Sequence, residues 1–265
     1  MHLETIGYSA TAPGATGTAA AALAGDSLTI KNSVLGKRAL IVAHVADKQL
    51  LGWEQVAFPS GHDSTRGYRV SAAASEVNNL LPRGLAHRVN PQETLSITMV
   101  GSITAGDVET GLLWVWYEDM PGINARLLTA AECLSRVEKL TTVYCSITTT
   151  AGPGWTGGEA ITSESDLLLA NRDYALLGAT CSIETAGIGV RSADWGGVRV
   201  AIPGNELRPD ITGRWFLDLA LSLDLPMIPV LNSGNKGNIL IDCAQDENAA
   251  AVTLSLILGL LPQGG

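Results

Sequence analysis

The chain has 265 residues, of which 46% are hydrophobic and only 16% are charged. Its formal net charge of −9 leaves no basic stripe to neutralise phosphates, so direct packaging of nucleic acid by this chain is not expected. The charged fraction lies well below the roughly 25% of average soluble proteins. We therefore expect partner subunits to cover much of the surface.

Neither a membrane span nor a secretory signal is evident. The most apolar stretch, 249–261, has 13 residues, whereas a membrane helix needs about 20. The start Met1-His2-Leu3-Glu4 lacks a basic region followed by an apolar core. These patterns predict a soluble protein made inside a cell.

The first half predicts strands and turns with one short helix. A first strand is followed by a second that ends at Pro59, because proline cannot donate to a ladder. A turn then leads to an amphipathic helix ended by Leu81-Pro82. Two strands follow, the first alternating and the second almost continuously apolar. In chain order these elements are expected at 39–45, 53–58, 60–64, 72–81, 95–99 and 112–117.

A helical connector is expected between the halves. Residues 123–140 carry apolar side chains at helical spacing, and Asn124 is a suitable cap for the start. The turn sequence Met120-Pro121-Gly122 marks a boundary before it.

The second half predicts the same series, with its second strand ending near Pro203 and its helix ended by Leu225-Pro226. The expected ranges are 174–181, 198–202, 204–206, 215–223, 239–243 and 252–261. An additional strand-like stretch, 142–148, precedes them.

The order of elements repeats because the sequence itself repeats weakly. Residues 38–43 resemble 174–179 at an offset of 136, and later segments match at an offset of 144. We assign the difference of eight to an insertion at 184–195, and infer a gene duplication. The matching segments at the larger offset are Val56-Ala57-Phe58-Pro59 with Val200-Ala201-Ile202-Pro203, and Leu81-Pro82 with Leu225-Pro226.

Two short motifs could carry chemistry, but the sequence favours a structural role for each. The stretch 152–157 matches G-x-G-x-x-G, yet no apolar helix follows to bind a pyrophosphate at its amino terminus. His62-Asp63-Ser64 has the residue types of a hydrolase triad, but adjacent residues rarely converge on one substrate atom. We interpret both as turns.

Metal sites and cysteine chemistry are not favoured. The histidines His2, His44, His62 and His87 are scattered, and we expect His44 to be packed or at the surface of a strand. The carboxylates of Asp242, Asp246 and Glu247 could hold calcium between subunits, although a solvated turn is the simpler interpretation. The four cysteines, expected to be buried thiols, are Cys133, Cys145, Cys181 and Cys243.

Trp114 and Trp116 lie on the same side of one predicted strand. Such a pair could form a stacking platform for a sugar ring. Alternatively it belongs to the core or to a subunit interface, where large rings contribute much of the burial. We favour core or interface.

The two successive β units, each with a helix before its last two strands, resemble the double jelly-roll major capsid proteins of tailless icosahedral viruses. The resemblance covers about 38–261 and is carried by the repeated segments and the closing strands. It implies an all-β fold of two tandem jelly-roll β-barrels with short helices in loops and a helical connector. The corresponding domains are 1–121 and 122–265.

The resemblance also implies a homotrimeric, pseudo-hexameric capsomer that contacts neighbouring capsomers. It allows contacts with minor capsid or internal membrane proteins as well. The location would be the capsid shell of a virion, with synthesis in the host cytoplasm. No catalytic, cofactor-binding or metal-binding residues are expected, and no enzyme activity. The alternatives are a tandem β-sandwich that binds carbohydrate through Trp114 and Trp116, and a tandem-barrel hydrolase or isomerase.

Overall fold

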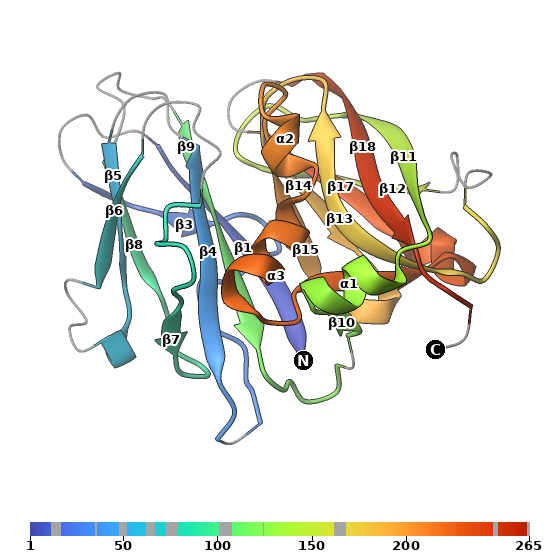
Figure 1. Ribbon diagram of the computed structural model, residues 1–265. Helices are drawn as coiled ribbons and strands as arrows, with labels where there is room; N and C mark the ends of the chain where they lie inside the picture. Colours follow the sequence, from blue (N-terminus) through green and yellow to red (C-terminus); the bar gives the residue numbers. More distant parts are fainter. Residues whose placement is uncertain are drawn as a thin grey trace.

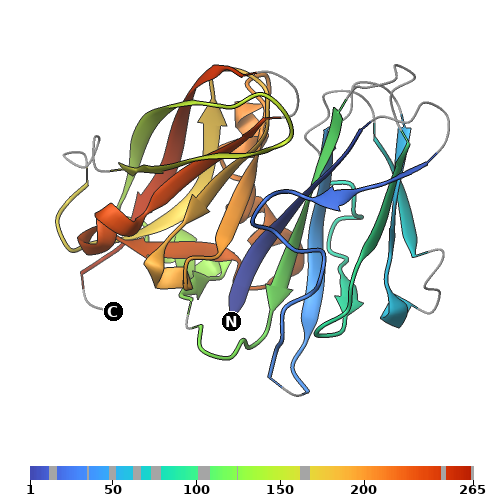
Figure 2. The ribbon, with the colours of Figure 1, turned by 180° about the vertical axis from the view of Figure 1, so that it is seen from behind.

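A computed structural model describes residues 1–11, 17–34, 36–47, 52–61, 67–72, 79–100, 108–123, 125–161, 168–245 and 249–263. Strands dominate this part of the chain, and its helices are few and short, which confirms the predicted all-β class. The strands form four sheets, arranged as two sandwiches side by side (Figures 1 and 2).

The first sandwich contains two sheets with strand orders β3-β1-β9-β4-β7 and β2-β8-β5-β6. Its strands are β1 (His2–Thr11), β2 (Thr18–Ala19), β3 (Ala21–Ala22), β4 (Ala39–Asp47), β5 (Gly52–Ala57), β6 (Tyr68–Ala72), β7 (His87–Val89), β8 (Ser96–Val100) and β9 (Val108–Tyr117), with a short 3-10 helix, η1 (Pro59–Gly61), after β5.

The second sandwich has strand orders β10-β16-β13-β18-β11 and β12-β17-β14-β15. Its strands are β10 (Leu127–Leu128), β11 (Lys139–Thr148), β12 (Gly154–Ala160), β13 (Asp173–Cys181), β14 (Thr185–Arg191), β15 (Arg199–Gly204), β16 (Ile228–Asn232), β17 (Leu240–Gln245) and β18 (Ala251–Leu260). Its helices are α1 (Ala130–Arg136), α2 (Pro209–Thr212) and α3 (Trp215–Leu223), with 3-10 turns η3 (Ala193–Trp195) and η4 (Ser233–Asn238).

Both sandwiches are jelly rolls, because eight strands in each pair in a nested order. The first strand pairs with the eighth, the second with the seventh, the third with the sixth and the fourth with the fifth. In the first half these pairs are β1–β9, β2–β8, β4–β7 and β5–β6. In the second half they are β11–β18, β12–β17, β13–β16 and β14–β15. Two tandem jelly rolls are therefore confirmed.

A β-bulge occurs at the same place in both halves. The register between the third strand, β4 or β13, and the eighth strand shifts after the third residue pair. The shift lies between Ile41 and Ala43 in the first half and between Leu176 and Gly178 in the second. Bulges are specific features of a strand pair, so this coincidence supports the inferred duplication.

The alignment of the repeat was wrong in its middle part. Pro59 follows β5, the fourth strand, whereas Pro203 lies within β15, the fifth. Residues 184–195, interpreted as an insertion, contain the fourth strand β14. The segments around the two prolines are both apolar strands, and that similarity misled the alignment. Pro82 and Pro226 do agree, since each precedes the sixth strand of its half, β7 or β16.

Of the three predicted helices, one is confirmed, one is confirmed in part, and one lies mostly outside the described residues. Helix α3 matches 215–223. The connector is helical only as α1, because Thr129 and Glu132 form a capping box and β10 and β11 occupy the flanks. Asn124 lies outside the described residues, as do 73–78 of the helix expected at 72–81, whose first residue ends β6. Strand β1 was not predicted at all.

The division at 121/122 stays a prediction. Strand β9 ends at Tyr117 and β10 begins at Leu127, and the four sheets of the described strands fall on either side of this segment. None of the helices in the described ranges has both the length and the apolar character needed to cross a bilayer.

Replacing Gly111 tests the packing inside the first jelly roll. The ring of Tyr8 lies over this glycine, and a Cβ there would be 2.3 Å from the Tyr8 hydroxyl oxygen. Gly111→Ala should therefore lower the free energy of unfolding by about 2 kcal/mol, measured by urea denaturation. Gly154→Ala, where a Cβ meets nothing within 4 Å, should have no such effect. Equal losses in both variants would contradict this packing.

Candidate functional site

The candidate site is the contact between the two halves, here called the seam. It also includes, on each half, the sheet face that corresponds to the face used by the other half at the seam. At the seam, β9 contacts β14 and β15, β1 contacts β15, and β4 contacts α3 (Figures 1 and 2). Apolar side chains on the outer face of the first half belong to the same buried cluster as the interior of the second half: Leu3, Val42, Ala43, Val45, Leu112, Trp114 and Trp116. The outer face of the first half thus belongs to the core of the second half, while the interior of the first half forms a separate core.

The two tryptophans of β9 lie at the centre of the seam. Trp114 is 0% exposed and Trp116 is 2% exposed. The indole N–H of Trp114 donates to the carbonyl of Ala201 at 2.7 Å, and that of Trp116 to the carbonyl of Pro226 at 3.0 Å. The Trp114 ring also packs on Trp215, with centroids 4.9 Å apart. The interpretation as core or interface is confirmed, and neither ring is available to a sugar.

Small residues on the second half allow the two sheets to approach. A Cβ on Gly187 of β14 would lie 2.8 Å from Leu112 Cδ1, so this position needs glycine. Beside it, the backbone N–H of Ala201 donates to the Thr5 hydroxyl at 2.8 Å. Sheet-to-sheet contact at this distance requires small residues on one face.

An ionic network closes one side of the seam. Arg199 of the second half bonds the carboxylate of Asp26 in the first half and that of Asp242 at 3.1 Å. Arg191 binds Asp242 through two nitrogens at 2.6 and 2.7 Å. The Trp155 indole donates to Asp26 at 2.9 Å, with the Arg199 guanidinium 4.3 Å from its ring centroid.

The two carboxyl groups of this network respond differently to their surroundings. Burial raises the pKa of Asp26, and the charge of Arg199 offsets this only in part. Burial also opposes ionisation of Asp242, but the hydrogen bond from Arg191 and the charge of Arg199 hold its pKa below the usual value. Two guanidinium groups on Asp242 disfavour a calcium ion there, and Asp246 and Glu247 lie outside the described residues.

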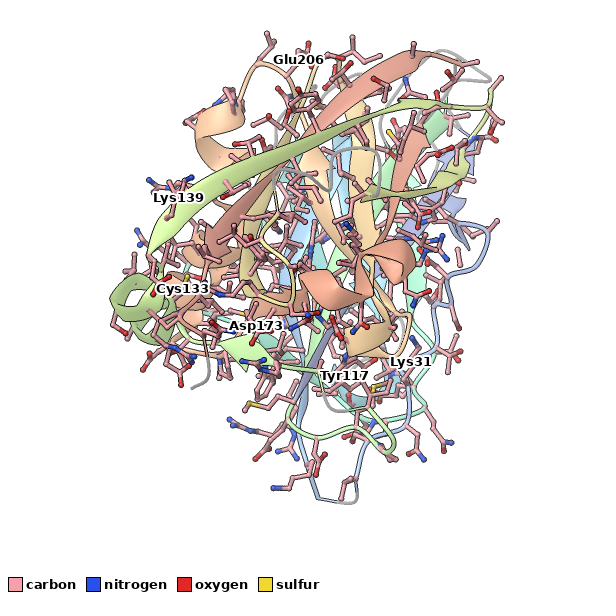
Figure 3. All side chains as sticks on the ribbon, turned by 90° about the vertical axis from the view of Figure 1, so that its right-hand side faces the viewer. Lys31, Tyr117, Cys133, Lys139, Asp173 and Glu206 are labelled. Atoms are coloured by element: carbon pink, nitrogen blue, oxygen red, sulfur yellow. The ribbon has the colours of Figure 1, made fainter. Side chains whose placement is uncertain are left out.

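The start of β1 brings buried ionisable groups to the edge of the seam. Glu4 bonds Lys31 at 2.8 Å, and the backbone N–H of Lys31 donates to the Tyr117 hydroxyl at 3.1 Å. Lys31 and Tyr117 are neighbours in Figure 3. Burial raises the pKa of Glu4 despite the charge of Lys31. His2 is fully buried, and burial together with Lys31 lowers its pKa to about 3.

The second half carries a counterpart of the seam face of the first half that is open along β11 and partly covered by α2 and Val137 elsewhere. Its β11 pairs with β18 on one side only and crosses the near face of the molecule in Figure 3, starting at Lys139. Leu140 is 62% and Tyr144 49% exposed on this strand. The other outward side chains of β11 and β18 are small or hydroxyl-bearing, apart from Ile257: Thr142, Ser146, Thr148, Ala251, Thr253 and Ser255.

The first half likewise carries an open counterpart of the seam face of the second half. This is the outer face of β2-β8-β5-β6. Here the exposed Arg69 of β6 stacks on the half-buried Trp53, 3.7 Å from its ring centroid, and donates to Gln55 at 3.0 Å. Arg199 on Trp155 is a similar stack at the seam, and both arginines are on the fifth strand of their half.

The structure describes only some of the remaining sequence candidates. Residues 62–64 lie outside the described residues. The glycine-rich stretch at 152–157 leads into β12, a strand. All four cysteines are free thiols, three of them buried and Cys181 partly so. Across the described ranges, no group of three or more His, Cys, Asp or Glu side chains could hold a metal ion.

The sequence analysis did not identify Asp26 and Arg199 of the seam network. It also did not identify Tyr8 and Glu54, which contact His44. His44, expected to be packed or at a surface, is packed inside the first jelly roll against Tyr8 and Glu54.

Among solved structures, the crystal structure of PBSX exported protein XepA resembles this chain. The alignment covers 96% of this chain and 86% of that chain, at 10% sequence identity and a TM-score of 0.28. No protein-family model matches the chain, and no curated protein matches it. A TM-score this low does not define a shared fold, so the topology above comes from strand pairing in this chain alone.

Removing His2 should flatten the acid side of the stability profile. Its folded-state pKa of about 3 lies below the ordinary 6.5, so the unfolded chain binds the proton more tightly and stability falls as pH drops below about 6.5. Between about pH 6.5 and 4.5 this costs on the order of 3 kcal/mol. His2→Leu should lack that loss in urea denaturation. A variant profile parallel to the wild type would contradict it.

Removing Asp26 should weaken the seam. Arg199 and Asp26 have side chains only 11% and 6% exposed, so Asp26→Ala leaves a buried cation with one partner fewer. We expect the free energy of unfolding to fall by about 3 kcal/mol. The control is Asp218→Ala in the exposed pair with Arg214, which should cause no measurable loss. Similar losses in the two variants would show that the seam network does not stabilise the chain.

Proposed function

We propose that this chain is the major coat protein of an icosahedral virus and acts by self-association into trimeric capsomers. The observation that carries the proposal is the double jelly roll in which each half uses a different one of its two sheets at the seam. The first half uses β1-β9-β4, and the second half uses β12-β17-β14-β15. The first half therefore leaves the outer face of β2-β8-β5-β6 open, and the second half leaves the outer face of β11-β18 open.

Because the two halves are repeats of one unit, the two open faces correspond to the two faces that meet at the seam. A second copy can place its open β2-β8-β5-β6 face on the open β11-β18 face of the first, which reproduces the seam between chains. Such a contact is heterologous, and heterologous contacts form rings when the rotation closes. Three copies, as the resemblance to double jelly-roll capsid proteins implies, would give a ring of six jelly rolls.

Charge and composition agree with a chain that is largely covered by its neighbours. With 16% charged residues, a monomer would leave Leu140, Tyr144 and Trp53 on open sheet faces. We expect a trimer interface of the obligate class, above about 2,000 Å² in total. Assembly needs no turnover, cofactor or metal, because burial of apolar surface drives it. The partners are then neighbouring capsomers, and the location is the virion shell.

The carbohydrate-binding alternative has no comparable support. The aromatic pair assigned to it, Trp114 and Trp116, is buried at the seam.

Charges placed on the open β11 face should block assembly without unfolding the chain. We expect wild-type protein to scatter light as about three times 27.6 kDa, from micromolar to low nanomolar concentration. The double variant Leu140→Glu, Tyr144→Glu should remain a folded monomer, since repulsion and desolvation oppose the contact. Leu207→Glu, at a leucine 72% exposed in a loop, is the matched control and should assemble.

One result would overturn the proposal, and another would exclude only the β11 face as the contact. One is a wild-type mass of 27.6 kDa at every concentration, with no larger species in crude lysate. The other is normal trimer formation by the double variant, which would exclude the β11 face while leaving trimerisation itself intact. Electron microscopy of lysate would show whether shells form.

A further inference from the structure

At the seam, a large side chain of the first half packs on a small residue of the second half. Leu112 of β9 lies so close to Gly187 of β14 that a Cβ on this glycine would be 2.8 Å from Leu112 Cδ1. Because the two halves share one order of strand pairing, their strand registers identify the residues that hold these two positions on the open faces.

Ser255 of β18 holds the position of Leu112 on the open face of the second half. The correspondence is counted from the β-bulge that both halves contain. In the third residue pair beyond the bulge, Val45 pairs with Leu112 in the first half, and Thr180 pairs with Ser255 in the second. A small hydroxyl-bearing side chain therefore stands where the seam has a leucine.

Trp53 of β5 holds the position of Gly187 on the open face of the first half. The fourth strand pairs with the seventh up to Ala57 in the first half and up to Arg191 in the second. Trp53 and Gly187 each lie four residues before this end. The Trp53 side chain points outward, because the next residue, Glu54, points into the jelly roll and bonds there. The large and the small residue are thus exchanged between the seam and the open faces.

The outer face of this sheet carries an indole with an arginine stacked on it in both halves. In the second half the indole is Trp155 of β12, with Arg199 4.3 Å from its ring centroid. In the first half the indole is Trp53 itself, with Arg69 3.7 Å from its ring centroid. At the seam, the side chains of Trp155 and Arg199 both bond a carboxylate of the other half. The stack on the open face is therefore suited to a contact of the same kind.

Strand β11 repeats the part of β1 that lies at the seam. Counted from the same bulge, Leu140 holds the position of Leu3, which is buried at the seam, whereas Leu140 is exposed. Thr142 holds the position of Thr5. At the seam, the Thr5 hydroxyl accepts a hydrogen bond from the backbone N–H of Ala201. Strand β11 can thus offer a second copy the apolar and hydroxyl contacts that β1 makes within the chain.

Part of the open face of the second half is covered by the chain itself. A Cβ on Gly259 would lie 2.7 Å from the side chain of Val137. A Cβ on Gly213, at the end of α2, would lie 2.9 Å from Ile257 Cδ1. A contact between copies is therefore confined to β11 and the neighbourhood of Ser255.

We infer that the contact between copies keeps the register of the seam, and that Trp53 of one copy packs over Ser255 of the next. This inference rests on the proposed self-association and adds the residue pair that selects the partner. Tyr144 pairs with Ser255 across β11 and β18, so the indole meets a small residue with an aromatic ring beside it. The stacked Arg69 orders the indole before the copies meet, which lowers the entropic cost of association.

The exchange of sizes makes the open faces selective. If the Trp53 face lay on a β9 face, the indole would meet Leu112, and two large side chains would overpack the contact. If the Gly187 face lay on the β11-β18 face, a gap would remain over Ser255. Of the four possible pairings of these faces, the seam and the contact between copies are the two that combine a large with a small residue. First halves therefore associate with second halves in both, which is the head-to-tail order of a closed ring.

A double-mutant cycle tests the pair, with fluorescence-detected sedimentation used to find the concentration at which half of the chain is trimeric. Ser255→Leu should raise this concentration at least about tenfold, because the leucine meets Trp53. Trp53→Ala should raise it about tenfold by removing the ring. The double variant places leucine on alanine, much as the seam places leucine on glycine, and should return to within about threefold of the wild type. Ser135→Leu, at an exposed position of α1, is the control and should assemble like the wild type.

A covalent test covers the case in which Ser255→Leu fails to fold. The double variant Trp53→Cys, Ser255→Cys, treated with a short bis-maleimide, should give covalent dimers and trimers on a denaturing gel. Each single cysteine variant is a matched control and should run as one chain, because a head-to-tail contact brings residue 53 to residue 255 and not to another residue 53. The native cysteines are present in all three variants.

The outcomes separate this inference from the proposed function. Losses that simply add in the cycle, or equal assembly of Ser255→Leu and the wild type, would overturn the residue pair while leaving self-association intact. A double-cysteine variant that is trimeric but gives no cross-links would do the same. A wild-type chain that stays monomeric at every concentration would overturn self-association and this inference with it.

Discussion

Strand β9 must be covered on both faces, and the rest of the structure depends on this constraint. One face fills the first jelly roll, and the other presents Leu112, Trp114 and Trp116 to the second half. A buried tryptophan removes about 150–250 Å² from water, so an isolated first half would expose an apolar face that water cannot accommodate. The two jelly rolls are consequently one structural unit, joined by a core rather than by a linker.

The corresponding face differs in the second half, and the difference bears on the proposed assembly. Strand register places Ser255 and Ile257 of β18 where β9 has Leu112 and Trp114. A contact between chains built on β11 and β18 is therefore more polar than the seam within the chain, and a lone chain tolerates it better in water. In the proposed assembly, the chain would fold around its apolar seam first and associate afterwards through the more polar face, which exposes less apolar surface to aggregation.

Local signals explain which parts of the fold the sequence predicted. The closing strands β9 and β18 and helix α3 were predicted because their apolar periodicity lies within a few consecutive residues. Strand β1 was missed because its buried His2, Glu4 and Thr5 look like surface residues. Lys31 and Ala201, the partners of Glu4 and Thr5, lie far along the chain. Strand β14 was read as an insertion because the alignment matched the apolar strand before Pro59, which is the fourth of its half, with the strand around Pro203, which is the fifth.

The candidate sites were harder to predict, since their residues converge only in the folded chain. Asp26 and Arg199 are 173 positions apart, and no spacing rule connects them. His44 gave a weak local signal, an imidazole within an apolar strand, but its partners come from β1, β5 and β6. This cluster lies with the apolar core of the first half, which is separate from the core that contains the seam.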